Sequence, residues 1–140
     1  MRWLQVLAVL GVLGLAANWL KDHREARAMQ VLMSPNGFLP VPMPEGAAAN
    51  TVLIFAPINC PKEGAQRARA LSEALTAQGI ANVKTDHYGS RSFTPSEEEF
   101  AKARRLDFVM TGELPIALIN GMGKANPSLE EVEAEYRRTQ

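Results

Sequence analysis

The feature that most constrains this chain is an uncharged run near the N-terminus, residues 3–20. Its length reaches the lower limit of what crosses the hydrocarbon core of a bilayer as a helix. Trp3 and Trp19 stand at its two ends, where aromatic side chains favour the membrane–water interface. The run is apolar on every side of a helix, which disfavours a surface helix of a soluble domain. We therefore expect residues 3–20 to be retained as a single membrane-spanning anchor.

A cleaved signal peptide is the alternative for the same residues. Small residues at 14–17 could form a cleavage site, but the positively charged segment before the apolar run is only Met1 and Arg2. The two interpretations differ in whether the mature protein keeps the anchor.

The orientation of the anchor is open. Lys21, Arg24 and Arg27 follow the apolar run and only Arg2 precedes it, which favours a cytoplasmic C-terminal domain. Short N-terminal tails of bacterial-type anchors commonly stay inside, which favours export. We expect a single-pass protein of the bacterial inner membrane with its C-terminal domain in the periplasm, and keep a cytoplasm-facing adaptor as an alternative.

The chain divides into three parts by composition. Residues 1–33 form the anchor and a helical stalk that the turn residues after Met33 end. Residues 34–50 contain Pro40, Pro42 and Pro44 among apolar residues, which is typical of an extended linker. An irregular edge strand over residues 38–41 is the alternative. Residues 51–140 should form one small folded domain.

Short apolar runs alternate with amphipathic stretches in the folded part, which predicts an α/β domain. The first strand and helix should form a unit with a parallel second strand. An Asn-Gly pair predicts a hairpin between the last two strands. The expected strands are residues 52–55, 82–87, 114–119 and 122–125, and the expected helices are residues 61–78, 95–108 and 129–138.

This order of elements resembles the thioredoxin fold over residues 51–138. Cys60-Pro61 stands where that family has its Cys-x-x-Cys motif, and Pro115 stands where the family has a cis-proline facing the active-site cysteine. Asn120-Gly121 and a terminal amphipathic helix match the common ending of these domains. The resemblance implies a three-layer sandwich with a central mixed sheet.

The chain departs from the family at three places. Glu63 replaces the second cysteine of the motif, Ile54 replaces a buried aspartate, and Ile58-Asn59 replaces the common aromatic residue. Since no resolving thiol is present, a dithiol oxidoreductase cycle within one molecule is excluded.

Cys60 has two interpretations. A cysteine at a helix N-terminus is stabilised as thiolate, with Lys62 as a minor electrostatic helper and Pro115 as a clamp for a partner's backbone. Against this, the carboxylate of Glu63 would favour the neutral thiol. The pattern of Cys60-Pro61-Lys62-Glu63 is also that of a helix start, as in Thr94-Pro95-Ser96-Glu97. Cys60 is therefore a candidate nucleophile or a structural residue.

Composition excludes several other classes of site. The formal net charge is zero, which gives no electrostatic case for nucleic acid. With one cysteine and two distant histidines, His23 and His87, we expect no disulfide framework and no metal site. Asp86 and His87 should point to opposite faces of a strand end. We expect no cofactor, with glutathione as the one small thiol that Cys60 could bind.

Two functions follow from the sequence. The first is a membrane-tethered thioredoxin-like module that binds an unidentified protein of the bacterial envelope without catalysis. The second is a monothiol redox factor of cell redox homeostasis that forms mixed disulfides through Cys60. The anchor binds the inner membrane through residues 3–20, and a homodimer could form through Cys60 or through the anchor.

Overall fold

A computed structural model describes residues 2–140, which divide into two compact units at Leu32 and Met33. The first unit is one continuous helix, α1 (Arg2–Leu32). By length and composition this helix can cross a membrane, and a signal sequence would meet the same criteria. Its large apolar side chains are exposed; examples are Trp3, Leu7, Leu10 and Leu15.

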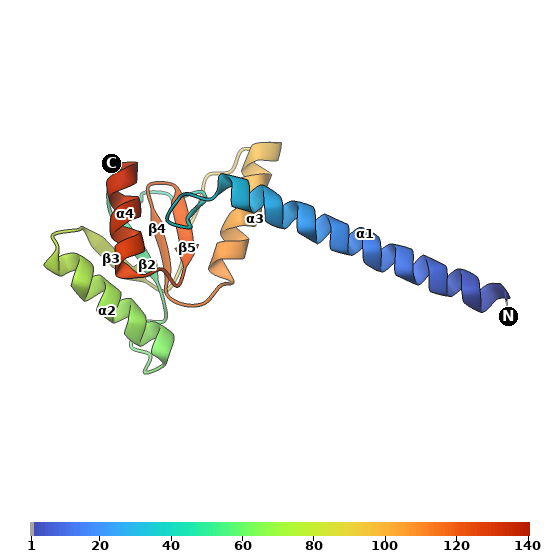
Figure 1. The fold of residues 1–140 in the computed structure, drawn as a ribbon. Helices are drawn as coiled ribbons and strands as arrows, with labels where there is room; N and C mark the ends of the chain where they lie inside the picture. The colour runs from blue at the N-terminus through green and yellow to red at the C-terminus, as the bar shows by residue number, and fades with distance from the viewer. Residues whose placement is uncertain (1) are drawn as a thin grey trace. The chain divides into compact units, whose positions relative to one another are not determined.

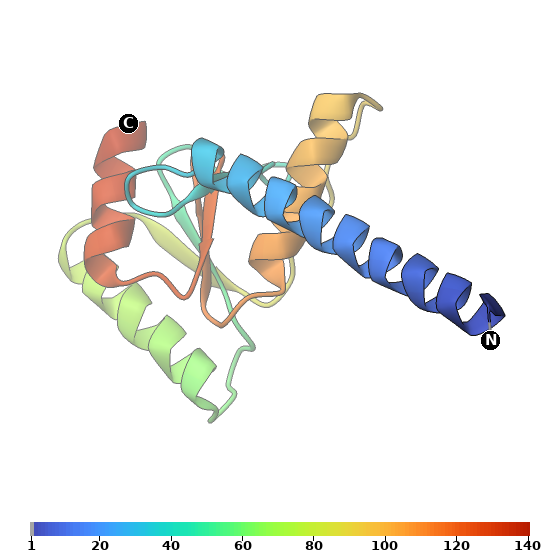
Figure 2. The same ribbon diagram turned by 45° about the vertical axis from the view of Figure 1, so that its right-hand side comes forward.

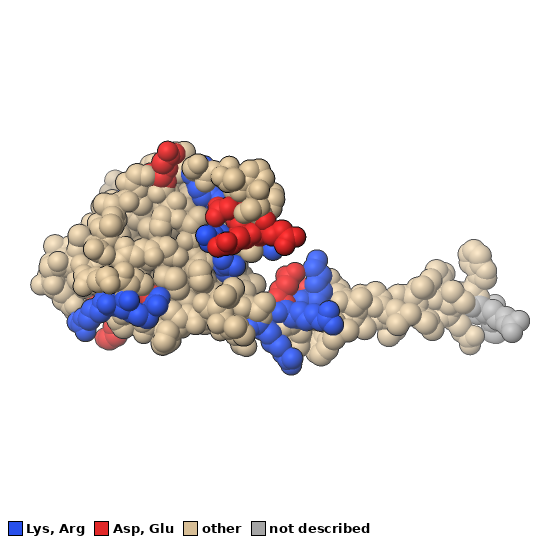
Figure 3. Space-filling model, turned by 90° about the horizontal axis from the view of Figure 1, so that it is seen from above, with Lys and Arg blue, Asp and Glu red and all other residues tan. Residues whose placement is uncertain are grey.

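Charge is distributed unevenly along α1. Figure 3 shows the coloured charged side chains of this helix gathered in one part of it, and an uncharged surface extends away from them. The charged group begins at Lys21, directly after the apolar run. The expected span and stalk are thus one helix, and the turn after Met33 ends it, with the Gly37 amide donating to the Ser34 carbonyl at 2.9 Å.

The second unit is an α/β fold built on a mixed five-stranded sheet with the strand order β1-β5-β4-β2-β3 (Figure 1). Central strand β2 pairs in parallel with β3 and antiparallel with β4, and β5 pairs antiparallel with β4 and β1. The strands are β1 (Leu39–Pro40), β2 (Val52–Phe55), β3 (Asn82–Thr85), β4 (Ile116–Ile119) and β5 (Met122–Ala125). The helices are α2 (Glu63–Ala77), α3 (Glu97–Met110) and α4 (Leu129–Thr139).

Helices cover the sheet from both sides. Figures 1 and 2 show α2 and α4 together on one side and α3 on the other. The buried core joins β2, β4, α2 and α4, and includes Ile54, Leu75, Ile119 and Val132. The helical spacing of Ala68, Leu71 and Leu75 predicts the buried face of α2, and the structure confirms it.

Within residues 34–50, the structure agrees with the alternative prediction of an edge strand over residues 38–41 rather than with a linker. Phe38 is completely buried in the core, and Leu39–Pro40 forms the edge strand β1 against β5. The Arg105 side chain donates a hydrogen bond of 2.6 Å to the Pro40 carbonyl. A proline lacks the N–H that a central strand needs but is accepted at a sheet edge, which is where Pro40 lies.

The expected helix starts for α2 and α3 are two residues too early. Each helix begins at the glutamate of its pattern, with Lys62 as the N-cap of α2 and Ser96 as the N-cap of α3. The Ser96 hydroxyl accepts a hydrogen bond from the Glu99 amide at 3.1 Å. A serine oxygen satisfies this free amide in the first turn. The prediction for α4 is confirmed, because Ser128 and Glu131 form a reciprocal capping box.

Candidate binding site around the loop after strand β2

The loop between β2 and α2 carries Cys60. Asn59 adopts a left-handed backbone conformation, with φ of 58°. Cys60 is half-buried and has a free thiol. Pro61 and Lys62 separate it from the first helical residue, so Cys60 lies outside the first turn of α2.

Arg67 connects the start of α2 to the segment before β4. Its Nη2 and Nε atoms donate to the Leu114 carbonyl at 2.7 and 3.2 Å. The same guanidinium pairs with Glu113 at 2.9 Å and with Glu63 at 2.8 Å. A planar guanidinium with several donors suits this role, which the compact ammonium group of a lysine could not fill.

Gly64 permits the close approach of these two segments. A Cβ atom at this position would lie 2.8 Å from Leu114 Cβ, closer than side chains pack. No sequence motif marks Arg67 or Gly64 as part of this contact. Only their placement one turn apart on the helix indicates that they face the same neighbour.

The remaining expected site residues lie around the same point. The Leu114–Pro115 peptide bond is cis, as the resemblance implies, and Pro115 is fully buried. The Leu114 carbonyl is already held by Arg67, so a partner's backbone would compete with that side chain for it. Glu63 is exposed and paired with Arg67, which draws its carboxylate into an ion pair. Lys62 is exposed.

An apolar cleft of about 420 Å³ lies between this loop and the segment before β4. Its one charged lining residue is Asp86, and Ile58 leaves 56 % of its surface exposed. The lining residues are Phe55, Ala56, Pro57, Ile58, Asp86, Met110, Leu114 and Ile116. Cys60 does not line this cleft. An exposed isoleucine beside an apolar cleft indicates a surface suited to contact with another apolar group.

Tyr88 supports the loop side of this cleft. Its ring stacks on Phe55 with centroids 6.1 Å apart, and its hydroxyl donates to the Pro42 carbonyl at 2.7 Å. Burial raises the pKa of the Tyr88 phenol above its ordinary value, although the charge of Arg91 acts in the opposite direction. Tyr88 therefore stays neutral and holds Phe55 in place at physiological pH.

A smaller cavity of about 160 Å³ lies on the α2 side of the same loop. It carries two cationic side chains, Arg69 from α2 and Lys84 from β3. Arg69 Nη1 donates to the Cys60 carbonyl at 3.2 Å. The loop thus separates an apolar cleft from a cationic cavity.

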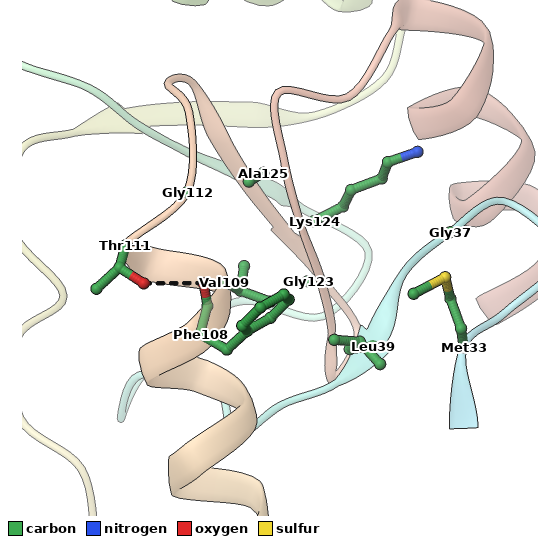
Figure 4. Close-up of a pocket in the computed structure, with 10 residues that line it drawn as sticks. All are labelled: Met33, Gly37, Leu39, Phe108, Val109, Thr111, Gly112, Gly123, Lys124 and Ala125. Carbon is green, nitrogen blue, oxygen red and sulfur yellow. Dashed lines mark hydrogen bonds between the residues drawn. The ribbon is translucent and has the colours of Figure 1, made fainter. Parts of the chain in front are cut away.

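A third cavity, of about 300 Å³, lies away from the Cys60 loop, between α3 and β5 (Figure 4). Met33, Leu39 and Phe108 give it apolar walls. Its one charged residue, Lys124, is already bound to Glu131 at 2.7 Å and to the Asn36 carbonyl at 3.1 Å. This cavity offers an apolar surface without a free charged group.

The expectation for Asp86 and His87 is wrong. Their side chains do not point apart but form an exposed pair with 2.8 Å between Asp86 Oδ1 and His87 Nδ1. The reason is that β3 ends at Thr85, so the alternation of a strand does not extend to them. The hydrogen bond with His87 holds the pKa of Asp86 below its ordinary value. Both side chains are exposed to solvent.

Comparison with known proteins finds no matching family model, no matching curated protein and no matching solved structure. The function must therefore be inferred from the residues of the site itself.

Proposed function

We propose that this chain is a membrane-tethered module of thioredoxin-like fold that binds a partner protein of the bacterial envelope through the cleft beside Ile58. Helix α1 would provide the tether, with the folded unit in the periplasm. The partner would place an apolar side chain in the cleft, and no covalent step is required.

Three observations support the fold assignment. The elements from β2 to α4 follow the order strand, helix, strand, helix, hairpin, helix that motivates the resemblance. The sheet is mixed, with a parallel pair at β2 and β3, and helices lie on both of its sides. The cis-proline position of the resemblance is occupied by Pro115. These observations support a three-layer sandwich of this fold over residues 51–140 as part of the proposal.

The observation that carries the binding role is the cleft of about 420 Å³. It is within the size range of sites that take a small ligand or a partner's side chain. Its lining comes from the end of β2 and the loop after it, from the residue after β3, from Met110 at the end of α3, and from the start of β4 with Leu114 before it. Arg67 and Gly64 fix one of these walls to α2. A cleft with fixed walls loses little conformational entropy on binding.

The monothiol redox role is the second candidate, and a free, half-buried Cys60 favours it. In that role the Cys60 thiolate would attack one sulfur of oxidised glutathione, form a mixed disulfide and release the other glutathione as thiolate. The binding role is preferred because Cys60 does not line the cleft and lies outside the first turn of α2.

Photo-crosslinking in intact membranes tests the binding role. A photoreactive amino acid at position 58 of the full chain should give a discrete adduct with one protein. Met110→Asp should remove this adduct, because it places a charge inside the apolar cleft. Thr111→Asp, one residue further and outside the cleft lining, should preserve it. Identical adducts from position 58 and from the exposed position 70 on α2 would refute the proposal.

A further inference from the structure

The cationic cavity on the α2 side of the loop has features of a binding site. Arg69 lies on α2 and Lys84 on β3, and both line the same space of about 160 Å³. The rest of the lining carries no charge and is mainly aliphatic: Ala56, Pro57, Ile58, Asn59, Ala65 and Ala68. Two cations of separate elements therefore share one small, largely apolar space.

Neither cation has an acidic partner within the part of the chain that the structure describes. Five lysine and arginine side chains in residues 2–140 do form ion pairs with carboxylates: Arg67, Lys102, Lys124, Arg137 and Arg138. Two like charges without a counter-charge repel each other at short range. An anion in this cavity would relieve that repulsion.

A hydrogen bond positions Arg69, whereas the exposed side chain of Lys84 is placed by its position on β3. Arg69 donates one N–H to the Cys60 carbonyl, and its side chain is half-buried, so the guanidinium is positioned before a ligand arrives. Lys84 shares a face of β3 with Asn82, whose side-chain oxygen accepts a hydrogen bond of 2.6 Å from Ser72 on α2. Lys84 therefore extends on the α2 side of the sheet.

We propose that this cavity binds a carboxylate on a short aliphatic stem, namely an acidic side chain of the partner protein. The volume is below the range of about 300–1,000 Å³ for drug-sized ligands, which favours a group the size of one side chain. The two cations suit a carboxylate, for which a guanidinium offers paired donors. The aliphatic walls suit the stem, whereas a phosphate group would leave these walls without an apolar contact.

The source of the carboxylate rests on the proposed function, since a partner bound beside Ile58 would reach both sides of the same loop. Ile58 lines both the apolar cleft and the cationic cavity. A partner segment with an apolar side chain followed by an acidic one would fill both. The two sites together would select partner segments with this pattern, whereas the cleft alone would select only an apolar side chain.

The test is an NMR titration of the full chain, labelled with ¹⁵N, in zwitterionic micelles at constant ionic strength. Sodium propionate should cause saturable shifts at the amides of residues 56 and 58–60 and at the Arg69 side chain, and uncharged propionamide should not. Arg69→Gln should weaken binding about tenfold or more, as expected when hydrogen bonds to a charged group are lost. Lys84→Gln should also weaken propionate binding, and this substitution removes no hydrogen bond to the loop. Arg104→Gln, an exposed arginine on α3, should leave binding unchanged.

Three outcomes would overturn the inference. They are equal shifts with propionamide, unchanged binding in both variants, and tighter binding of inorganic phosphate at the same residues. A blocked Ala-Glu-Ala peptide should bind in place of propionate, and its glutamine counterpart should not. Exclusion of the peptide while propionate binds would contradict a partner side chain as the source. Because propionate binding needs no partner and crosslinking at position 58 needs no carboxylate, the inference and the proposed function can fail separately.

Discussion

The hydroxyl of Ser34 donates a hydrogen bond of 2.9 Å to the carboxylate of Glu135, which joins the first turn of the folded unit to its last helix. Asn36 donates to the same oxygen at 2.9 Å, and Arg138 forms an ion pair with the other. Glu135 is completely buried. A buried carboxylate with this many partners stabilises the position of the segment that leads into β1.

Glu135 should make the stability of the folded unit depend on acid. Burial acts most strongly on this group and raises its pKa, but the hydrogen bonds from Arg138, Asn36 and Ser34 together hold the pKa below its ordinary value of 4.5. A carboxyl group whose pKa is lowered by folding stabilises the folded state at any pH above its ordinary pKa. This contribution is lost as the pH falls below about 4.5.

Glu135→Gln should therefore lower the free energy of unfolding by about 1–3 kcal/mol at pH 7 and flatten its decline between pH 5 and 3. Thermal unfolding across this pH range measures both effects. Glu130→Gln, an exposed residue of the same helix, serves as control and should change little. A decline of unchanged steepness in Glu135→Gln would contradict this account.

Arg67→Gln should loosen the segment before β4. The variant loses the ion pairs with Glu63 and Glu113 and weakens the bonds to the Leu114 carbonyl, which should cost about 1–2 kcal/mol and accelerate hydrogen exchange after Thr111. Arg137→Gln removes a surface pair on α4 and should cost less than about 0.5 kcal/mol. Equal effects of the two substitutions would show that Arg67 is an ordinary surface residue.

Gly64→Ala can either raise or lower the stability of the folded unit, and the direction tests the contact with Leu114. In an open helix position, alanine would stabilise the chain by about 0.5–1 kcal/mol. Here the added Cβ would lie 2.8 Å from Leu114 Cβ, so we expect destabilisation of about 1–3 kcal/mol instead. Denaturant unfolding of the full chain in micelles measures the difference. A gain in stability would mean that Leu114 moves aside at no cost.

Cys60→Ser separates the two proposed functions. For a binding module, this change should leave the adduct at position 58 intact and alter stability by less than about 1 kcal/mol. For a monothiol redox factor, the wild-type chain should accumulate a mixed disulfide with oxidised glutathione, measurable by mass spectrometry, and the variant should lose its function. Appearance of that disulfide at physiological glutathione levels would favour the redox role.

A single charged substitution in the apolar run tests whether α1 is a membrane anchor. Leu10→Arg, inside the apolar run, should cost about 2.5 kcal/mol or more of insertion free energy and release part of the chain from carbonate-washed membranes. Val31→Arg, near the far end of α1, should not. A reporter fused after Met33 should be active in the periplasm, and activity only in the cytoplasm would reverse the orientation. The intact mass of the mature chain reveals cleavage.

The sequence pattern predicts the elements of the folded unit better than their contacts. Strand β5 has the expected bounds, because an Asn-Gly turn and a Ser128 cap mark its surroundings. Strand β1 needs β5 and Arg105, both distant in the chain, so the proline-rich segment alone does not specify it. The helix starts are misplaced because the spacing of proline and glutamate is compatible with two start positions. At α3 the Ser96 hydroxyl caps the later start, whereas Lys62 at α2 makes no side-chain capping bond.

The candidate site illustrates the same limit. Cys60 and Pro115 can be identified from motifs, but the cleft depends on Met110 and Leu114, which carry no motif. Arg69 and Lys84 line the same cavity because α2 packs on β3. The spacing of residues in the sequence does not predict this contact. The contact between Asp86 and His87 is also not predictable from the sequence, because it depends on β3 ending before Asp86.

The short connection between α1 and the sheet has a consequence for how a partner is found. Helix α1 ends at Leu32, and Phe38 is already in the core, so the tether between them reaches at most about 3.6 Å per residue. A chain that keeps its anchor therefore stays within the length of its stalk and this connection from the bilayer, and it diffuses in two dimensions. Confinement of this kind raises the effective concentration of any partner held in the same membrane, so a weak individual contact can suffice.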